Sequence, residues 1–142
     1  MKHFIFSVFL LLPVVVVSQD QNFWDTLAKV RFENRKDKSG YDVEVPVFSP
    51  PLLAFHNKKI TLKGYIIPLE ELGGQGRFML SALPFNLCFF CGAAGPETVI
   101  EVQTPLKIPF TTKPITLEGT LLLNDKDPNH HMYILSAAKR LN

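Results

Sequence analysis

From residue 58 onward, hydrophobic and polar side chains alternate along the chain in short runs. In the first run, Ile60, Leu62 and Ile66 are separated by polar residues or glycine, and a period of two is typical of a strand with one buried face. Similar runs predict four further strands, with glycine, asparagine and proline residues between them. The five predicted strands cover residues 60–67, 78–83, 98–102, 115–123 and 132–137.

Five closely spaced strands in a short chain either close into a barrel or leave long unpaired edges. Gly64 and Gly119 lie in mid-strand, where glycine allows a sheet to coil sharply. We therefore predict an all-β fold, a small five-stranded barrel of oligonucleotide/oligosaccharide-binding (OB) topology over residues 58–142. The alternative is an open β-sandwich.

The preceding segment, residues 19–57, is predicted to lie outside the barrel. Trp24 and Leu27 have the spacing of one helical face, which predicts a short helix over residues 23–30. Residues 31–40 are charged and contain Gly40, which indicates an exposed loop. Residues 41–47 alternate, and Pro46 favours an edge strand over a central one.

The N-terminus has the features of a secretory signal peptide. Lys2 precedes an apolar run of 14 positions over residues 4–17, and small residues then favour cleavage after Ser18. A membrane anchor is the alternative, but a spanning helix needs about 20 apolar residues and this run contains Pro13. We expect a periplasmic or secreted protein without a membrane span after cleavage.

The net charge of the mature chain bears on which classes of partner to expect. Removing residues 1–18 takes one charge, Lys2, from 15 basic side chains and leaves 14 against 13 acidic ones. Nucleic acids and anionic membranes attract clustered positive charge. A nearly neutral mature chain therefore gives no reason to expect either partner.

The two cysteines form one C-x-x-C pair, Cys88 and Cys91. Such a pair can be half of a metal site, a redox-active dithiol or a structural disulfide. Outside the cytoplasm, nearby thiols tend to oxidise unless a metal or a reductant protects them.

Barrel topology predicts where the reactive residues meet. With strand order 1-2-3-5-4-1, the start of the first strand and the second-to-third and fourth-to-fifth loops leave the barrel at one end. These places hold His56, then Cys88 with Cys91, then His130 with His131. Two thiolates with one or two imidazoles would bind zinc or copper(I).

Other interpretations of the loop stay open. Firm zinc signatures carry a second pair of ligands, so an inert disulfide ranks close to a metal site. Redox chemistry needs a cation or a helix N-terminus beside the thiol, and no lysine or arginine lies between Arg77 and Lys107. Glu97 could be an oxygen ligand or simply begin the next strand.

Several short segments of the mature chain carry a resemblance to a known family. They are Trp24-Asp25-x-Leu27, Gly64-Tyr65-Ile66-Ile67-Pro68-Leu69-Glu70, Phe78-Met79-Leu80 and Ile115-x-x-x-Gly119-x-Leu121. In them the chain resembles small exported bacterial proteins known only as a domain of unknown function. Members often carry Cys-x-His where this chain has Cys88-x-x-Cys91, so Phe90 stands at the histidine position. The family often accompanies export or metal-uptake transport genes, which implies a metal-handling role.

Three functions follow as expectations, in this order. The first is an exported, non-enzymatic metal-binding or metal-delivery protein that serves a transporter or another protein of the cell envelope. The second is a binding module in which the cysteines form a structural disulfide, and the third is a thiol-disulfide redox protein. Hydrolase and nucleotide chemistry lack support, because the chain has no nucleophile elbow, phosphate loop or H-E-x-x-H motif.

Overall fold

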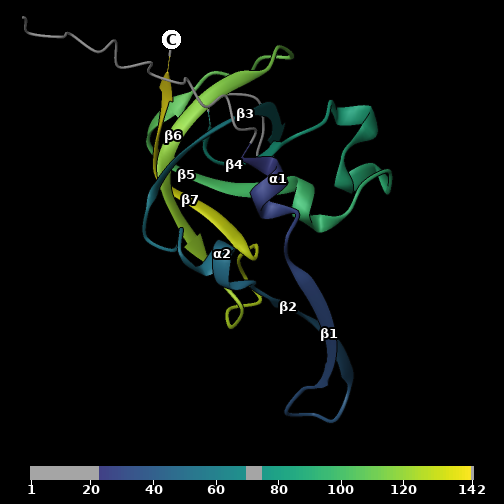
Figure 1. Ribbon diagram of the computed structural model, residues 1–142. Helices are drawn as coiled ribbons and strands as arrows, with labels where there is room; N and C mark the ends of the chain where they lie inside the picture. The colour runs from purple at the N-terminus through teal and green to yellow at the C-terminus, as the bar shows by residue number, and fades with distance from the viewer. Residues whose placement is uncertain (1–22, 70–74, 142) are drawn as a thin grey trace, which may run out of the picture.

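The computed structural model describes residues 23–69 and 75–141. Its centre is a closed barrel with the strand order β3-β4-β5-β7-β6, drawn in Figure 1. The barrel strands are β3 (Lys59–Pro68), β4 (Gln75–Ser81), β5 (Val99–Ile108), β6 (Ile115–Leu123) and β7 (Tyr133–Leu141). This confirms the predicted five-stranded barrel, and the strand order is that of the predicted OB topology.

Strand directions also follow that topology. β5 and β7 are parallel, while the other four neighbouring pairs, including the closing pair β3–β6, are antiparallel. Strands come close together at the two mid-strand glycines: a Cβ at Gly64 would collide with the Ser81 carbonyl oxygen, and one at Gly119 would lie 2.9 Å from the Ser136 carbonyl oxygen. Both positions therefore need glycine for tight strand packing, as expected where a barrel coils.

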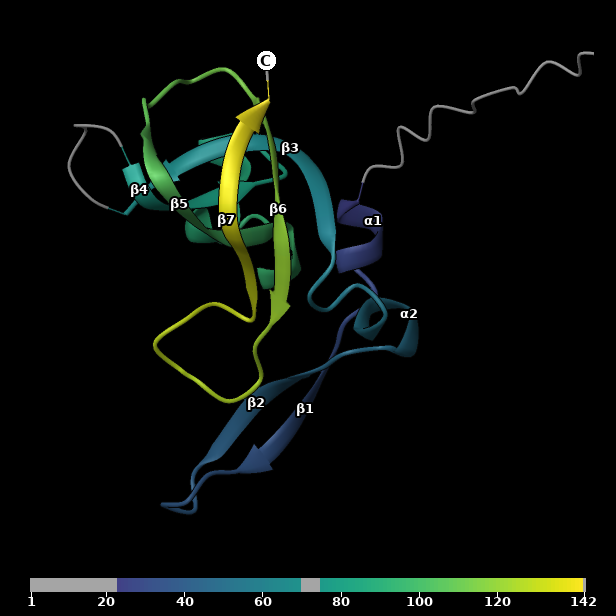
Figure 2. The same cartoon turned by 90° about the vertical axis from the view of Figure 1, so that its left-hand side faces the viewer.

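Two short helices close one side of the core. α1 (Trp24–Leu27) is shorter than the predicted helix, and α2 (Pro50–Leu53) precedes β3. Trp24, Leu27 and Leu52 are buried with the inward-facing residues of the barrel. The Tyr133 hydroxyl donates a 2.7 Å hydrogen bond to the Leu27 carbonyl, which ties α1 to β7. Figure 2 shows both helices beside the barrel.

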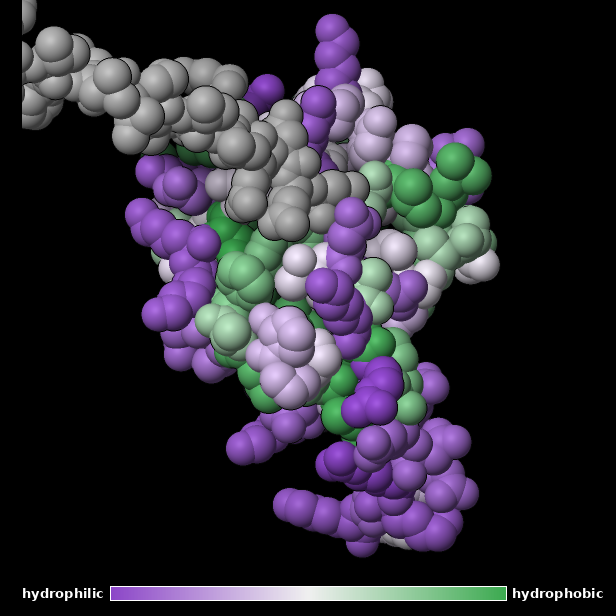
Figure 3. All heavy atoms as spheres, viewed as in Figure 1, coloured by the Kyte–Doolittle hydropathy of each residue, from purple (hydrophilic) through white to green (hydrophobic). Residues whose placement is uncertain are grey.

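The prediction of a loop over residues 31–40 is wrong for residues 31–36. β1 (Arg31–Lys36) is a strand that pairs with β2 (Asp42–Val47) in a separate two-stranded sheet. Its charged sequence concealed the strand because a hairpin with both faces in water needs no apolar alternation. The Asp37 carboxylate accepts hydrogen bonds from the backbone of Ser39 and Tyr41 and shapes the turn. The hairpin points away from the barrel and is strongly hydrophilic (Figures 1 and 3).

Two further expectations concern membranes and export. None of the helices within the described ranges is long and apolar enough to cross a membrane. The predicted signal peptide and its cleavage after Ser18 lie outside the described residues.

Candidate functional site

The cysteine loop, residues 82–98 between β4 and β5, consists largely of three single turns of 3₁₀ helix. These are η1 (Phe85–Leu87), η2 (Phe89–Cys91) and η3 (Pro96–Thr98). A backbone hydrogen bond from Cys91 N–H to the Cys88 carbonyl, 3.1 Å long, closes the turn between the cysteines. Gly92 then ends η2 with φ +74°, in the left-handed region that favours glycine.

This turn places the two thiols at different depths. Cys88 is fully buried on the outer face of the barrel, where it packs with Ile67, Met79 and Val99. Cys91 is exposed, and its thiol donates a 2.9 Å hydrogen bond to the Phe85 carbonyl. Cys88 lies close enough to Cys91 to influence the pKa of its thiol. One thiol is thus buried inside the loop and the other lies at its surface.

The surroundings of Cys91 do not activate its thiol. Desolvation and then the neighbouring Cys88 raise the pKa of Cys91 above its ordinary value. A raised pKa leaves less thiolate at neutral pH, and thiolate is the species that attacks a disulfide. The raised pKa of Cys91 therefore gives no support to disulfide exchange at this thiol.

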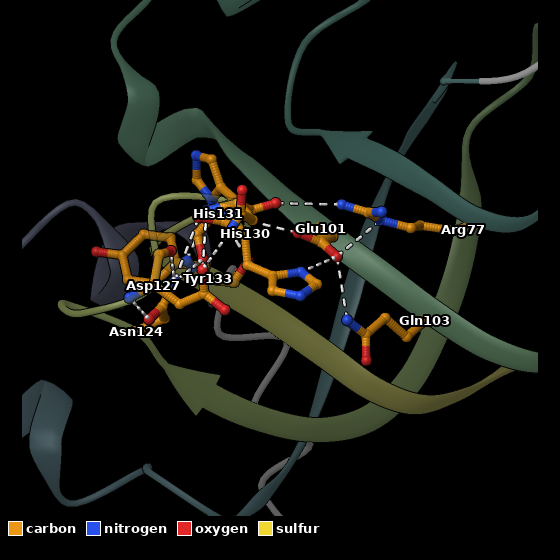
Figure 4. Close-up of polar contacts among 9 residues, drawn as sticks. Arg77, Glu101, Gln103, Asn124, Asp127, His130, His131 and Tyr133 are labelled. Carbon is orange, nitrogen blue, oxygen red and sulfur yellow. Dashed lines mark hydrogen bonds and ion pairs between the residues drawn. The ribbon is translucent and has the colours of Figure 1, made fainter.

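Glu101 forms the second concentration of polar groups. Ile100 and Val102 point into the barrel core, so Glu101 lies on the outer face of β5, where it is only 2% exposed. Figure 4 shows the Glu101 cluster, which we define as Glu101 and the four residues that donate to it. Its carboxylate accepts hydrogen bonds from Arg77 Nε (3.0 Å), Gln103 Nε2 (3.0 Å), His130 Nδ1 (2.9 Å) and the His131 backbone N–H (3.0 Å).

These contacts keep Glu101 ionised. Burial raises the pKa of a carboxylic acid, and it is the largest single influence on Glu101. The hydrogen bonds from Gln103, His131 and His130, together with the Arg77 charge, outweigh burial and lower the pKa of Glu101 below its ordinary value. The carboxylate therefore holds the loop between β6 and β7 against β5 as a charged group.

Each of the three predicted histidine ligands has a hydrogen bond within the fold. His56 Nδ1 accepts a 3.0 Å hydrogen bond from the Leu123 backbone N–H. His131 Nδ1 accepts one of 3.1 Å from Tyr133 N–H, and its Nε2 is buried without a hydrogen-bond partner among the described residues. His130 binds Glu101.

The structure brings together only part of the predicted metal site. Cys88 and Cys91 are adjacent, and His130 and His131 meet at Glu101. Among residues 23–69 and 75–141, however, no group of three or more histidine, cysteine, aspartate or glutamate side chains is arranged to hold a metal ion. Glu97 lies with its carboxylate against Gly95, inside its own turn.

Sequence reasoning missed Glu101 and its partner Arg77. The available signal was a single acidic residue within an otherwise apolar strand segment, Val99-Ile100-Glu101-Val102. Buried acidic side chains are rare unless they are paired. Such a position predicts a nearby cation or several donors.

The cysteine loop also exposes large hydrophobic side chains. Phe85, Leu87 and Phe90 are 62%, 49% and 51% exposed, and we call these three the apolar patch. Figure 3 shows hydrophobic residues at the surface on the side where the loop lies, and others over the middle of the molecule. Grouped apolar exposure of this kind is typical of a contact surface.

Comparison of the chain with protein-family models, curated proteins and solved structures gives no match. The resemblance to the exported family of unknown function therefore stays a prediction.

Proposed function

We propose that this protein is an exported, non-enzymatic accessory protein that binds or delivers a metal ion through Cys88 and Cys91. The observation that supports this most is that two free thiols lie in one turn, closed by the hydrogen bond from the Cys91 N–H to the Cys88 carbonyl, with one thiol buried and one at the surface. Thiolate sulfur is a strong ligand for zinc and copper(I). The exposed sulfur gives an ion a route in and out.

The setting agrees with delivery rather than with catalysis. Apolar side chains surround Cys88, and no general base or charged group of the described chain forms a hydrogen bond with either thiol. The predicted signal peptide would direct the protein to the periplasm or the exterior, where a transporter or another protein of the cell envelope would receive the ion.

Metal retention by reduced protein tests the proposal. Protein purified under reducing conditions, exposed to zinc or copper(I) and desalted should retain about one ion per chain, a stoichiometry that follows from one pair of thiol ligands. Elemental analysis measures it. Cys91→Ser should abolish retention, and protein alkylated at both thiols is the matched control. Reduced wild-type protein that retains neither metal would end the proposal.

The apolar patch favours a second candidate function, a binding module whose cysteines are joined as a disulfide. Phe85, Leu87 and Phe90 would then contact a partner protein of the envelope. Thiol labelling of protein taken directly from its native compartment separates the two functions. Unreactive thiols before reduction, with no metal present, favour the binding module, while metal-protected thiols favour the ion carrier.

A further inference from the structure

We infer that the ion carried by the cysteine loop is copper(I), held by the sulfurs of Cys88 and Cys91 without an imidazole ligand. This inference rests on the proposed function and narrows it from metals in general to one ion and one set of donor atoms. The observations behind it are the number of donors, their chemical type and their surroundings.

The number of donors argues against zinc. Structural zinc sites have four ligands in tetrahedral geometry, so zinc would need two further side chains beside the thiols. The described residues provide no group of even three suitable side chains. The rings of His56 and His130 are engaged at their Nδ1 atoms by the Leu123 N–H and the Glu101 carboxylate. An imidazole hydrogen-bonded at Nδ1 can still coordinate a metal through Nε2, but among the described residues neither ring belongs to a ligand group with the two thiols.

Copper(I) matches what the loop offers. It has a filled d shell and, unlike zinc, is stable with only two thiolates bound in a line. Soft sulfur donors select copper(I) over harder ions, and the residues packed around Cys88 add only aliphatic, aromatic and thioether groups. These are Ile67, Met79, Val99 and the partly buried Phe89.

The binding step is balanced without a redox partner. Copper(I) replaces the two thiol protons, two Cu–S bonds form, and two protons pass to solvent. The metal and both sulfurs keep their oxidation states. The product carries one negative charge, and the buried Cys88 sulfur would hold the ion while the exposed Cys91 sulfur exchanges first with thiols of a receiving protein.

A competition experiment tests the inference on the full mature chain. Reduced protein in deoxygenated buffer is titrated with copper(I) against the chelator bicinchoninate, and separately with zinc against a zinc-binding dye. We expect one copper(I) per chain, X-ray absorption that shows sulfur neighbours and no imidazole, and copper(I) retention in the presence of excess zinc. Cys91→Ser should weaken copper(I) binding by about 100-fold or more, because even residues behind the ligands typically change metal affinity by about 10- to 100-fold.

Imidazole variants are the matched controls. His56→Gln and His130→Gln should leave the copper(I) affinity unchanged. A loss of affinity in either variant, or imidazole scattering in the absorption spectrum, would overturn the inference while the metal-carrier function stands. Tighter binding of zinc than of copper(I) would have the same consequence. Failure to bind either metal would remove the proposed function itself. Because Cys91 is exposed, its substitution should not disturb folding, so the test does not depend on the buried Cys88.

Discussion

The Glu101 cluster and the cysteine loop lie next to each other on the outer face of β4 and β5. Met79, which packs against Cys88, is the residue on β4 that pairs with Glu101 on β5. In the first, four donors from three segments converge on one carboxylate. In the second, two thiols share one turn, and within residues 23–69 and 75–141 the Phe85 carbonyl is the only group that forms a side-chain hydrogen bond with either of them. The difference teaches that a histidine or an acid in a loop is not evidence of a binding site until its bonding capacity is counted.

Removing the Glu101 carboxylate is the strongest test of this contrast. Glu101→Ala leaves Arg77, the His130 ring and the His131 N–H without their shared acceptor. A hydrogen bond to a charged group typically contributes about 1.5–3 kcal/mol. Because the Arg77 side chain is 48% exposed and can be solvated by water once Glu101 is gone, we expect a total loss of about 3 kcal/mol in the free energy of unfolding. Urea denaturation followed by Trp24 fluorescence measures it.

Glu118→Ala is the matched control. Glu118 also has two cationic partners, Lys59 and Lys139, at 3.7 and 3.0 Å, but both lysines are largely exposed and water screens the pairs. A much smaller effect is expected. Equal losses in the two variants would mean that the Glu101 cluster is an ordinary surface network.

The sequence predicts the barrel well because the barrel strands obey the alternation that burial demands. The prediction of strand ends fails where the pairing between two neighbouring strands shifts by one or more residues. β5 runs beyond Val102 through Pro105, and the pairing with β4 shifts between Gln75 and Arg77, so the proline falls where ladder bonds are interrupted. β7 likewise continues past Ala137, which has φ +49°, opposite the shift between Glu118 and Thr120. Bulges of this kind leave no periodic signal.

The site is less predictable than the fold for a different reason. Topology predicts which loops leave the barrel at one end, but not which side-chain atoms are already bonded there. His56 and His130 lie in the predicted loops, and the fold engages both through contacts with Leu123 and Glu101 that are distant in sequence. Cys88 and Cys91, by contrast, are brought together by one local turn, so their spacing in the sequence is enough to predict that they are neighbours.

Serine substitutions at the two cysteines sharpen the comparison within the loop. Cys88→Ser buries a hydroxyl among Ile67, Met79 and Val99, and an unsatisfied buried hydroxyl costs about 1–3 kcal/mol in proteins. Cys91→Ser should leave the unfolding free energy unchanged, because the side chain is exposed. Thermal unfolding of both reduced variants measures the difference. Equal destabilisation would show that the exposed thiol also supports the fold.

Acidification should weaken the fold by a smaller amount in two steps, the first at His131 and the second at Glu101 together with the partly exposed Glu118 and the exposed Asp127, whose pKa values are also lowered. Burial lowers the pKa of His131 below its ordinary value of 6.5, so the unfolded chain takes up a proton before the native one does, and stability falls as the pH drops through that value. Glu101 has a pKa below its ordinary value of 4.5 in the folded chain, so its carboxylate stabilises the fold at pH values above 4.5. This stabilisation is lost as the pH falls from 4.5 through the lower pKa of the folded state. Unfolding free energies across this range should therefore decline twice.

His131→Asn should remove the first decline, while Glu118→Gln should retain it. An unchanged first decline in His131→Asn would assign the proton uptake to another group.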